Sequence, residues 1–112
     1  MSIVPLSNNE TLTRDDEKMQ YRSFGKTGLM VSALSFGCMR LSDNMDLNEN
    51  LISKAIDCGI NYFETTRGYC SGQCQQRTAP GLKGKNKGVI VSGKSPIGPD
   101  TTAYEFRKEI EL

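Results

Sequence analysis

The feature that most constrains this chain is an alternation of short apolar runs with helix-like segments, preceded by a hairpin pattern. Two extended runs, residues 21–24 and 29–34, flank a turn bounded by glycines, which is typical of a β-hairpin. Three further apolar runs follow around residues 34–39, 60–64 and 89–92. Strands that alternate with helices favour right-handed βαβ units, so the sequence predicts an α/β fold with a parallel sheet.

The first helix is expected between residues 46 and 59. Asp46 with Glu49 three positions later is a capping-box pattern, and Gly59 stands where a C′ glycine would end the helix. Apolar residues at helical spacing predict one buried face, formed by Leu47, Leu51, Ile52, Ala55 and Ile56. Cys58 is expected to pack beside this helix.

Two further helices are expected. The second is predicted to be short, from about residue 73 to residue 79, because Pro80 removes a donor and clashes with the preceding turn. The third begins at a capping box formed by Thr102 and Glu105, with Ala103, Phe106 and Ile110 on one face. The run at residues 89–92 is continuously apolar and β-branched, which predicts a buried parallel strand.

Charge and composition exclude several classes of protein. Lys and Arg number 14 against 13 Asp and Glu, a balance that argues against a nucleic-acid or anionic-membrane partner. No apolar run approaches the roughly 20 residues of a membrane span, and the N-terminus has no secretory signal, so we expect a cytoplasmic protein with reduced thiols. Residues 1–18 are predicted to be a disordered polar tail, followed by one small domain over residues 19–112.

The sequence contains no histidine, which excludes any catalytic site or metal site that needs an imidazole. Acid–base chemistry must therefore come from Tyr, Lys, Cys or a carboxylate. Glu64 and Lys94 close two successive predicted strands, and Tyr69 lies in the loop between them. The C-terminal ends of parallel strands meet at one edge of a sheet, where a Lys ammonium would stabilise tyrosinate and a carboxylate would orient the Lys. These residues are candidates for proton donation to a carbonyl oxygen; the alternative is a Tyr at the core edge beside a solvated Lys and a strand-end Glu.

Three of the four cysteines are candidates for a second kind of site. Cys70 and Cys74 are spaced C-x3-C, and Cys38 is expected at another strand end, so these thiols could gather. A metal site usually needs four ligands and a C-x2-C spacing, and no metal is expected here. A thiol or metal module built on Cys70 and Cys74 remains an alternative.

Four segments carry a resemblance to the aldo-keto reductases. Residues 19–40, MQYRSFGKTGLMVSALSFGCMR, resemble the opening of that family, and residues 55–69, AIDCGINYFETTRGY, resemble its A-I-D-x-G-x-N-x-F-D-T-A-x-x-Y unit. Residues 89–94 and 100–111 look like its third strand and helix. The family fold is a (β/α)8 barrel closed at the bottom by a hairpin, which takes about 250 residues. The resemblance therefore implies an incomplete (β/α)8 TIM barrel, the N-terminal hairpin plus about three βα units.

The resemblance also implies a function and a cofactor. In this family NADPH gives a hydride to an aldehyde or ketone and a Tyr gives the proton. Tyr69 matches the acid, Lys94 the lysine, and Glu64 stands at the aspartate position, one methylene longer. The segment Gly37, Cys38 and Met39, with Glu64, matches residues that line the cofactor, whereas the main phosphate and adenine contacts belong to the last strands.

By the same resemblance, the family histidine follows the fourth strand, beyond Leu112. The 112-residue chain alone is therefore expected to lack activity. Open sheet edges would allow self-association. The alternative is a non-enzymatic binding or assembly module, a partial barrel completed by another chain.

Overall fold

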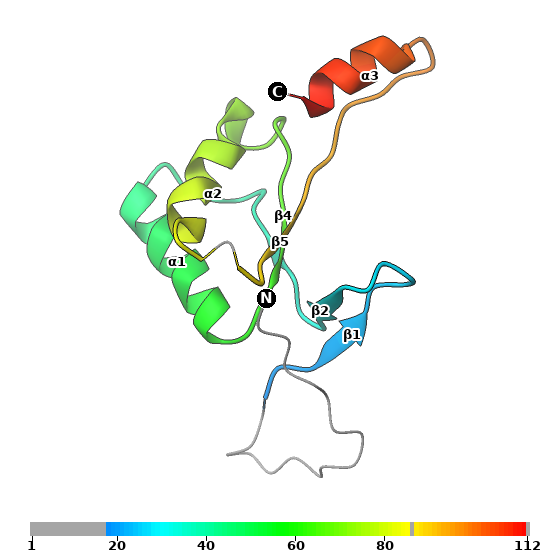
Figure 1. Ribbon diagram of the computed structural model, residues 1–112. Coiled ribbons are helices and arrows are strands. Elements are labelled where there is room, and N and C mark those ends of the chain that lie inside the picture. The colour runs from blue at the N-terminus through cyan, green and yellow to red at the C-terminus, as the bar shows by residue number, and fades with distance from the viewer. Residues whose placement is uncertain (1–17, 86, 112) are drawn as a thin grey trace.

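The computed structural model describes residues 18–85 and 87–111, so all but one residue of the predicted polar tail lies outside the described residues. Figure 1 shows a hairpin, a small sheet with two helices on one side, and a third helix at the far end. The elements, in order, are β1 (Tyr21–Ser23), β2 (Met30–Ser32), β3 (Phe36–Gly37), α1 (Met45–Asp57), β4 (Tyr62–Glu64), η1 (Cys70–Gly72), α2 (Cys74–Leu82), β5 (Ile90–Ser92) and α3 (Ala103–Ile110).

The hairpin and the alternating order of strands and helices are confirmed. β1 pairs antiparallel with β2, and Phe24 N–H donates to Leu29 O at 2.8 Å across the turn. The second sheet has the order β3-β4-β5 and both of its pairings are parallel. Asn61 joins the two sheets, because its Oδ1 accepts from Ser32 N at 2.7 Å and its Nδ2 donates to Met30 O at 2.9 Å.

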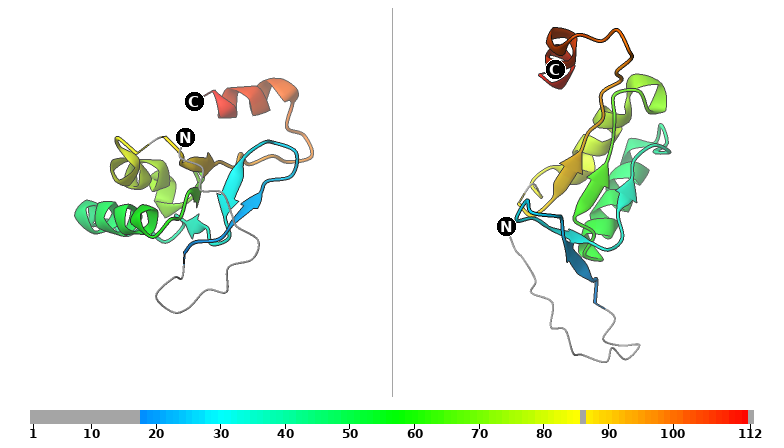
Figure 2. Two further views of the ribbon diagram at one scale, coloured as in Figure 1. Left: turned by 60° about the horizontal axis from the view of Figure 1, so that its bottom comes forward. Right: turned by 90° about the vertical axis from the view of Figure 1, so that its right-hand side faces the viewer.

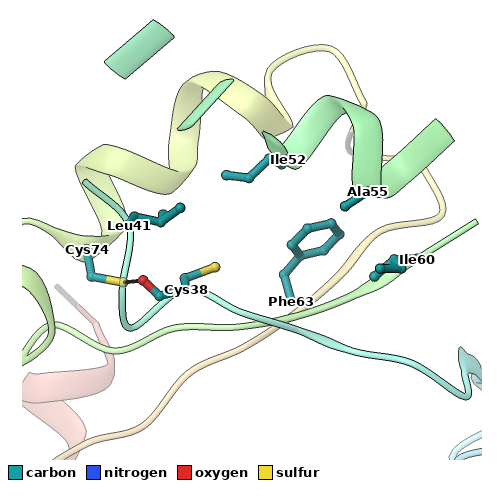
Figure 3. Packing of buried hydrophobic residues seen from close by; sticks show 7 residues of the cluster. All are labelled: Cys38, Leu41, Ile52, Ala55, Ile60, Phe63 and Cys74. Carbon is teal, nitrogen blue, oxygen red and sulfur yellow. Dashed lines mark hydrogen bonds between the residues drawn. The ribbon is translucent and has the colours of Figure 1, made fainter. Parts of the chain in front are cut away.

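The core lies between the β3-β4-β5 sheet and the layer formed by α1 and α2 (Figure 3). Phe63 in β4 and Ile52 in α1 are both fully buried. The Phe63 ring lies 5.4 Å from the Phe36 ring, centroid to centroid, so neighbouring strands pack through aromatic side chains on this face. Burial of this apolar surface is the main stabilising contribution in a domain of this size.

The predicted start and apolar face of α1 are partly wrong. The N-cap is Asn44, whose side chain accepts from Leu47 N at 3.0 Å, so Asp46 lies inside the first turn. Leu47 and Leu51 are exposed, and the buried face consists of Asn48, Ile52 and Ala55. Asn48 can be buried because its amide bonds Ser42 on both sides: Nδ2 donates to Ser42 O, and Oδ1 accepts from Ser42 N.

The second helix is short, as predicted, but its predicted end at residue 79 is wrong, because α2 continues through Pro80 to Leu82. Proline removes only one N–H donor, and helix packing offsets that loss. Gly81 lies so close to α1 that a Cβ at that position would stand 2.5 Å from Ile52 Cβ. The close approach of the two helices therefore decides the length of α2, which local sequence signals do not contain.

Two predictions of burial are wrong. Cys58 is exposed, because Gly59 takes a φ of +93° directly after it and turns the chain out of α1 toward β4. β5 is parallel as predicted, but Val91 is 49% exposed although it pairs with the fully buried Phe63, because β5 is an edge strand that has a partner on one side only among the described residues.

The third helix begins as predicted and packs differently. Thr102 and Glu105 form the complete capping box. However, no residue of α3 is buried, and Figure 2 shows α3 well separated from the α1 and α2 layer. The apolar face that the sequence predicts on this helix, Ala103, Phe106 and Ile110, is therefore exposed in this structure. Within residues 18–85 and 87–111, every helix is too short or too polar to cross a bilayer.

Candidate active site

Tyr69, Lys94 and Glu64 form one connected group at the C-terminal ends of β4 and β5. Lys94 Nζ donates to Tyr69 Oη at 2.6 Å and lies 2.7 Å from Glu64 Oε1. The same ammonium stands 5.1 Å from the centroid of the Tyr69 ring. A single cation therefore contacts both the phenol oxygen and the carboxylate.

Each of the three side chains is placed by a different element. Glu64 is the last residue of β4, and Tyr69 is the N-cap residue of η1. The sequence predicts that Lys94 closes its strand, but β5 ends at Ser92 and Lys94 lies two residues past it. The two loops are joined by Thr66, whose buried hydroxyl donates to Lys94 O at 3.0 Å. Sequence analysis missed Thr66, because a loop threonine gives no signal of its own.

Electrostatics keep the ammonium of this group charged. The pKa of Lys94 is raised, first by its hydrogen bond to Glu64 and then by its hydrogen bond to Tyr69. Both partners accept hydrogen bonds from the ammonium through oxygen atoms, which favours the protonated amine. Lys94 is thus a permanent cation at neutral pH, held where it stabilises charge on the Tyr69 oxygen.

A cavity of about 550 Å³ opens beside this group, which is the size of a small-molecule site. Tyr69, Lys94, Thr66 and Ser95 line it, with Arg67 and Glu109 at the side toward α3. A slightly larger hollow of about 630 Å³ lies along α3, but its lining includes neither Tyr69 nor Lys94. Of these two cavities, the one of about 550 Å³ is therefore the one that Tyr69 and Lys94 face.

The segment predicted to line a cofactor divides into exposed and buried parts. Gly37 and Met39 are exposed, and a Cβ on Gly37 would meet nothing within 4 Å. Cys38 is fully buried, its N–H donates to Glu64 O at 2.9 Å, and its side chain lies in the core (Figure 3). Gly37 and Met39 offer surface for a ligand, while Cys38 anchors the segment to β4.

The structure brings Cys38, Cys70 and Cys74 into one neighbourhood. Cys74 Sγ and Cys70 Sγ both contact Cys38 O, at 3.3 and 3.8 Å. Burial is the largest effect that raises the pKa of both Cys38 and Cys70. Among the described residues, no group of His, Cys, Asp and Glu has the arrangement of a metal site.

Fold and site together define an α/β protein with a Tyr–Lys–carboxylate group at the C-terminal edge of a parallel sheet. The structure is similar to the aldo-keto reductase AKR11C1 from Bacillus halodurans (holo form), with a TM-score of 0.65 and 29% sequence identity over 74% of this chain. The sequence is 34% identical over 82 residues to the "Probable voltage-gated potassium channel subunit beta" of Arabidopsis thaliana, 68% of this chain. It is 26% identical over 77 residues to the uncharacterized oxidoreductase YqkF of Bacillus subtilis (strain 168), 69% of this chain. No protein-family model matches the chain.

The chain is therefore related to the aldo-keto reductase family over about two thirds to three quarters of its length. It spans 25% of the length of these curated relatives and 28% of the solved structure. The family relationship accordingly rests on this portion alone.

Proposed function

We propose that this chain supplies the hairpin and first three βα units of a (β/α)8 barrel that reduces an aldehyde or ketone to an alcohol with NADPH. The observation that carries the proposal is the contact of Lys94 Nζ with both Tyr69 Oη, at 2.6 Å, and Glu64 Oε1, at 2.7 Å. Parallel pairing of β3, β4 and β5 behind an N-terminal hairpin supports the barrel portion of the proposal.

Each residue of the group has a separate task in this reaction. Tyr69 donates its phenolic proton to the carbonyl oxygen as negative charge develops there. Lys94 stabilises the phenolate that remains, and Glu64 holds the ammonium in position. NADPH, when bound, supplies the hydride. General acid catalysis of this kind contributes typically about 10²–10⁴-fold.

The residues proposed to contact the cofactor fit an extended, flat ligand. Gly37 leaves space where a side chain would stand, and Met39 is a residue 46% exposed. Cys38 holds the backbone between them through its bond to Glu64 O. Glu64 thus connects the proposed cofactor segment to the Tyr69–Lys94 pair.

The test uses a chimera in which residues 19–111 replace the matching segment of the Bacillus halodurans reductase. We expect NADPH-dependent reduction of aldehydes or ketones, and Tyr69→Phe should lower kcat by about 10²–10⁴-fold with little change in cofactor affinity. The 112-residue chain by itself should show no turnover. Turnover by the isolated chain that Tyr69→Phe abolishes would contradict the partial-barrel proposal.

Lys94→Met in the chimera should act in the same direction as Tyr69→Phe, because it removes the cation beside the phenol. Glu64→Asp is the informative control. If Glu64 acts as the family carboxylate, this shorter residue should keep or raise activity; if the site serves another purpose, the substitution should do neither, and activity should fall.

A second measurement applies to the isolated chain and does not need the chimera to fold. The raised pKa of Lys94 should make it react more slowly with an amine-acylating reagent than the exposed Lys83. Glu64→Gln should remove much of this protection. Equal reactivity of Lys94 and Lys83 in the unaltered chain would contradict the proposed site geometry.

A second candidate function, an assembly module, is supported by the exposed sheet edges. Among the described residues, β3 and β5 each pair on one side only, which leaves unpaired backbone groups at both edges. The large apolar side chains exposed in the sheet, its loops and α1 include Leu34, Leu47, Leu51, Val91 and Ile97. Sedimentation that shows concentration-dependent association would favour this function, whereas a sharp, concentration-independent melt of a monomer would contradict it.

A further inference from the structure

Two thiols converge on one backbone oxygen beside the turn that carries Tyr69, and the proposed reductase chemistry uses neither of them. Cys74 Sγ lies 3.3 Å from Cys38 O, a contact drawn in Figure 3, and Cys70 Sγ lies 3.8 Å from the same atom. Cys70 Sγ also contacts Met39 O at 3.4 Å. The two sulfurs therefore occupy the same small region between the β3–α1 loop and the start of α2.

The backbone between the two cysteines is folded so that they face the same way. Cys70 and Ser71 have φ values of 53° and 54°, in the left-handed region that residues with side chains rarely adopt. This turn lets Gln73 N–H donate to Cys70 O at 3.1 Å and Cys74 N–H donate to Tyr69 O at 3.2 Å. A C-x3-C spacing that would separate two side chains in an extended segment here brings them together.

We propose that Cys70 and Cys74 form a redox-active dithiol that a hydroperoxide converts to an intramolecular disulfide. Cys70 is only half-buried, so its thiolate is the group that attacks the peroxide oxygen, forms a sulfenic acid and releases an alcohol or water. Cys74 is buried against it and attacks the sulfenic sulfur, which forms the S–S bond and releases water. Two thiols are oxidised, the O–O bond is reduced, and a dithiol reductant reverses the step.

The surroundings of Cys70 set the pH at which this reaction proceeds. The titratable and charged groups that face it are the thiols of Cys74 and Cys38 and the guanidinium of Arg77. Burial and the Cys74 thiol raise the pKa of Cys70, and Arg77 opposes them. Because the thiolate is the nucleophile, the rate of oxidation should rise steadily from pH 7 to pH 9.

The experiment exploits the positions of trypsin sites. Cleavage after Arg67 and Arg77 places both cysteines in the single peptide 68–77, whereas Cys38 lies in peptide 27–40 and Cys58 in peptide 55–67. The reduced chain is treated with hydrogen peroxide, its free thiols are blocked, and the digest is analysed by mass spectrometry. We expect peptide 68–77 to be unblocked and lighter by two hydrogen atoms, and to be restored by dithiothreitol.

Matched variants complete the test. Cys70→Ser and Cys74→Ser should each abolish the internal disulfide, and Cys58→Ser should leave it unchanged. A main cross-link between peptides 27–40 and 68–77, or oxygen addition alone, would overturn the proposal.

Discussion

The α1 and α2 layer and α3 differ in packing although their local signals are similar. α1 begins at Asn44, whose side chain accepts from Leu47 N, and α3 begins at a complete capping box between Thr102 and Glu105. Yet α1 and α2 bury residues against each other and the sheet, whereas α3 buries none. Good caps therefore define where a helix begins and say nothing about whether it becomes part of a core.

The candidate site lies at the boundary between these two regions. Glu64 and Tyr69 belong to the packed region, and Lys94 belongs to the segment that leads to α3. Thr66 holds Lys94 O from the packed side, and Arg67 pairs with Glu109 of α3 at 2.7 Å. The pair is partly exposed on both sides, so it stabilises the position of α3 only weakly.

The largest expected effect comes from the core. Phe63→Ala should lower the free energy of unfolding by about 3–5 kcal/mol, because Phe63 is fully buried and its loss leaves a cavity. That is a large part of the roughly 5–15 kcal/mol that holds a domain together. Phe106→Ala in α3 is the matched control and should change stability by only about 0.5 kcal/mol. If thermal or urea unfolding showed equal losses of stability for the two variants, α3 and the core would not differ in packing as described.

Two glycine substitutions test whether α1 and α2 are in close contact at Gly81. Gly81→Ala should destabilise by about 1–3 kcal/mol, because the new Cβ would stand 2.5 Å from Ile52 Cβ. In a free helix the same change would stabilise by about 0.5–1 kcal/mol, so the sign itself is diagnostic. Gly68→Ala, where nothing lies within 4 Å, should leave the urea midpoint almost unchanged. A more stable Gly81→Ala protein would show that α1 and α2 are not in close contact.

The cap of α3 should matter locally and not globally. Thr102→Ala removes the acceptor for Glu105 N and should cost α3 about 1 kcal/mol of helix stability. Hydrogen exchange over residues 103–110 should accelerate, while exchange in α1 should not change. Thr102→Ser keeps the hydroxyl and serves as the control. Faster exchange throughout the chain would mean that α3 contributes to the core after all.

The smallest effect is a pH dependence confined to α3. Hydrogen bonds from Thr102 lower the pKa of Glu105 below its ordinary value of 4.5. A lowered pKa in the folded helix means that the capping contribution is complete above pH 4.5 and is lost as pH falls through the folded value. Helix protection over residues 103–110 should therefore decrease in acid, and Glu105→Gln should remove most of this dependence. An unchanged acid profile in that variant would contradict the capping role.

Much of the fold followed from local chemistry in the sequence. The hairpin, the order of elements, the parallel pairing and the Thr102 capping box were predicted from turn residues, apolar spacing and cap patterns. The proximity of Glu64, Tyr69 and Lys94 followed from one topological rule, because parallel strands end at one edge. Their catalytic roles stay a prediction for the chimera to test.

Other features depended on contacts between distant residues. The length of α2 depends on how Gly81 meets Ile52, and the burial of Asn48 depends on Ser42 satisfying its amide. The Thr66 hydroxyl donates to Lys94 O across 28 positions of sequence, a contact that no local sequence pattern predicts.

The sequence by itself determined the hairpin, the order of strands and helices, and the start of α3, because those follow from backbone preferences and side-chain bonds within a few residues. Only the tertiary structure decided which helix faces are buried, how far α2 extends, and which thiols meet beside Tyr69. Burial and close packing depend on the shape of the partner surface. That surface comes from residues far away in the chain, such as Ile52 for Gly81 and Cys38 for Cys70 and Cys74.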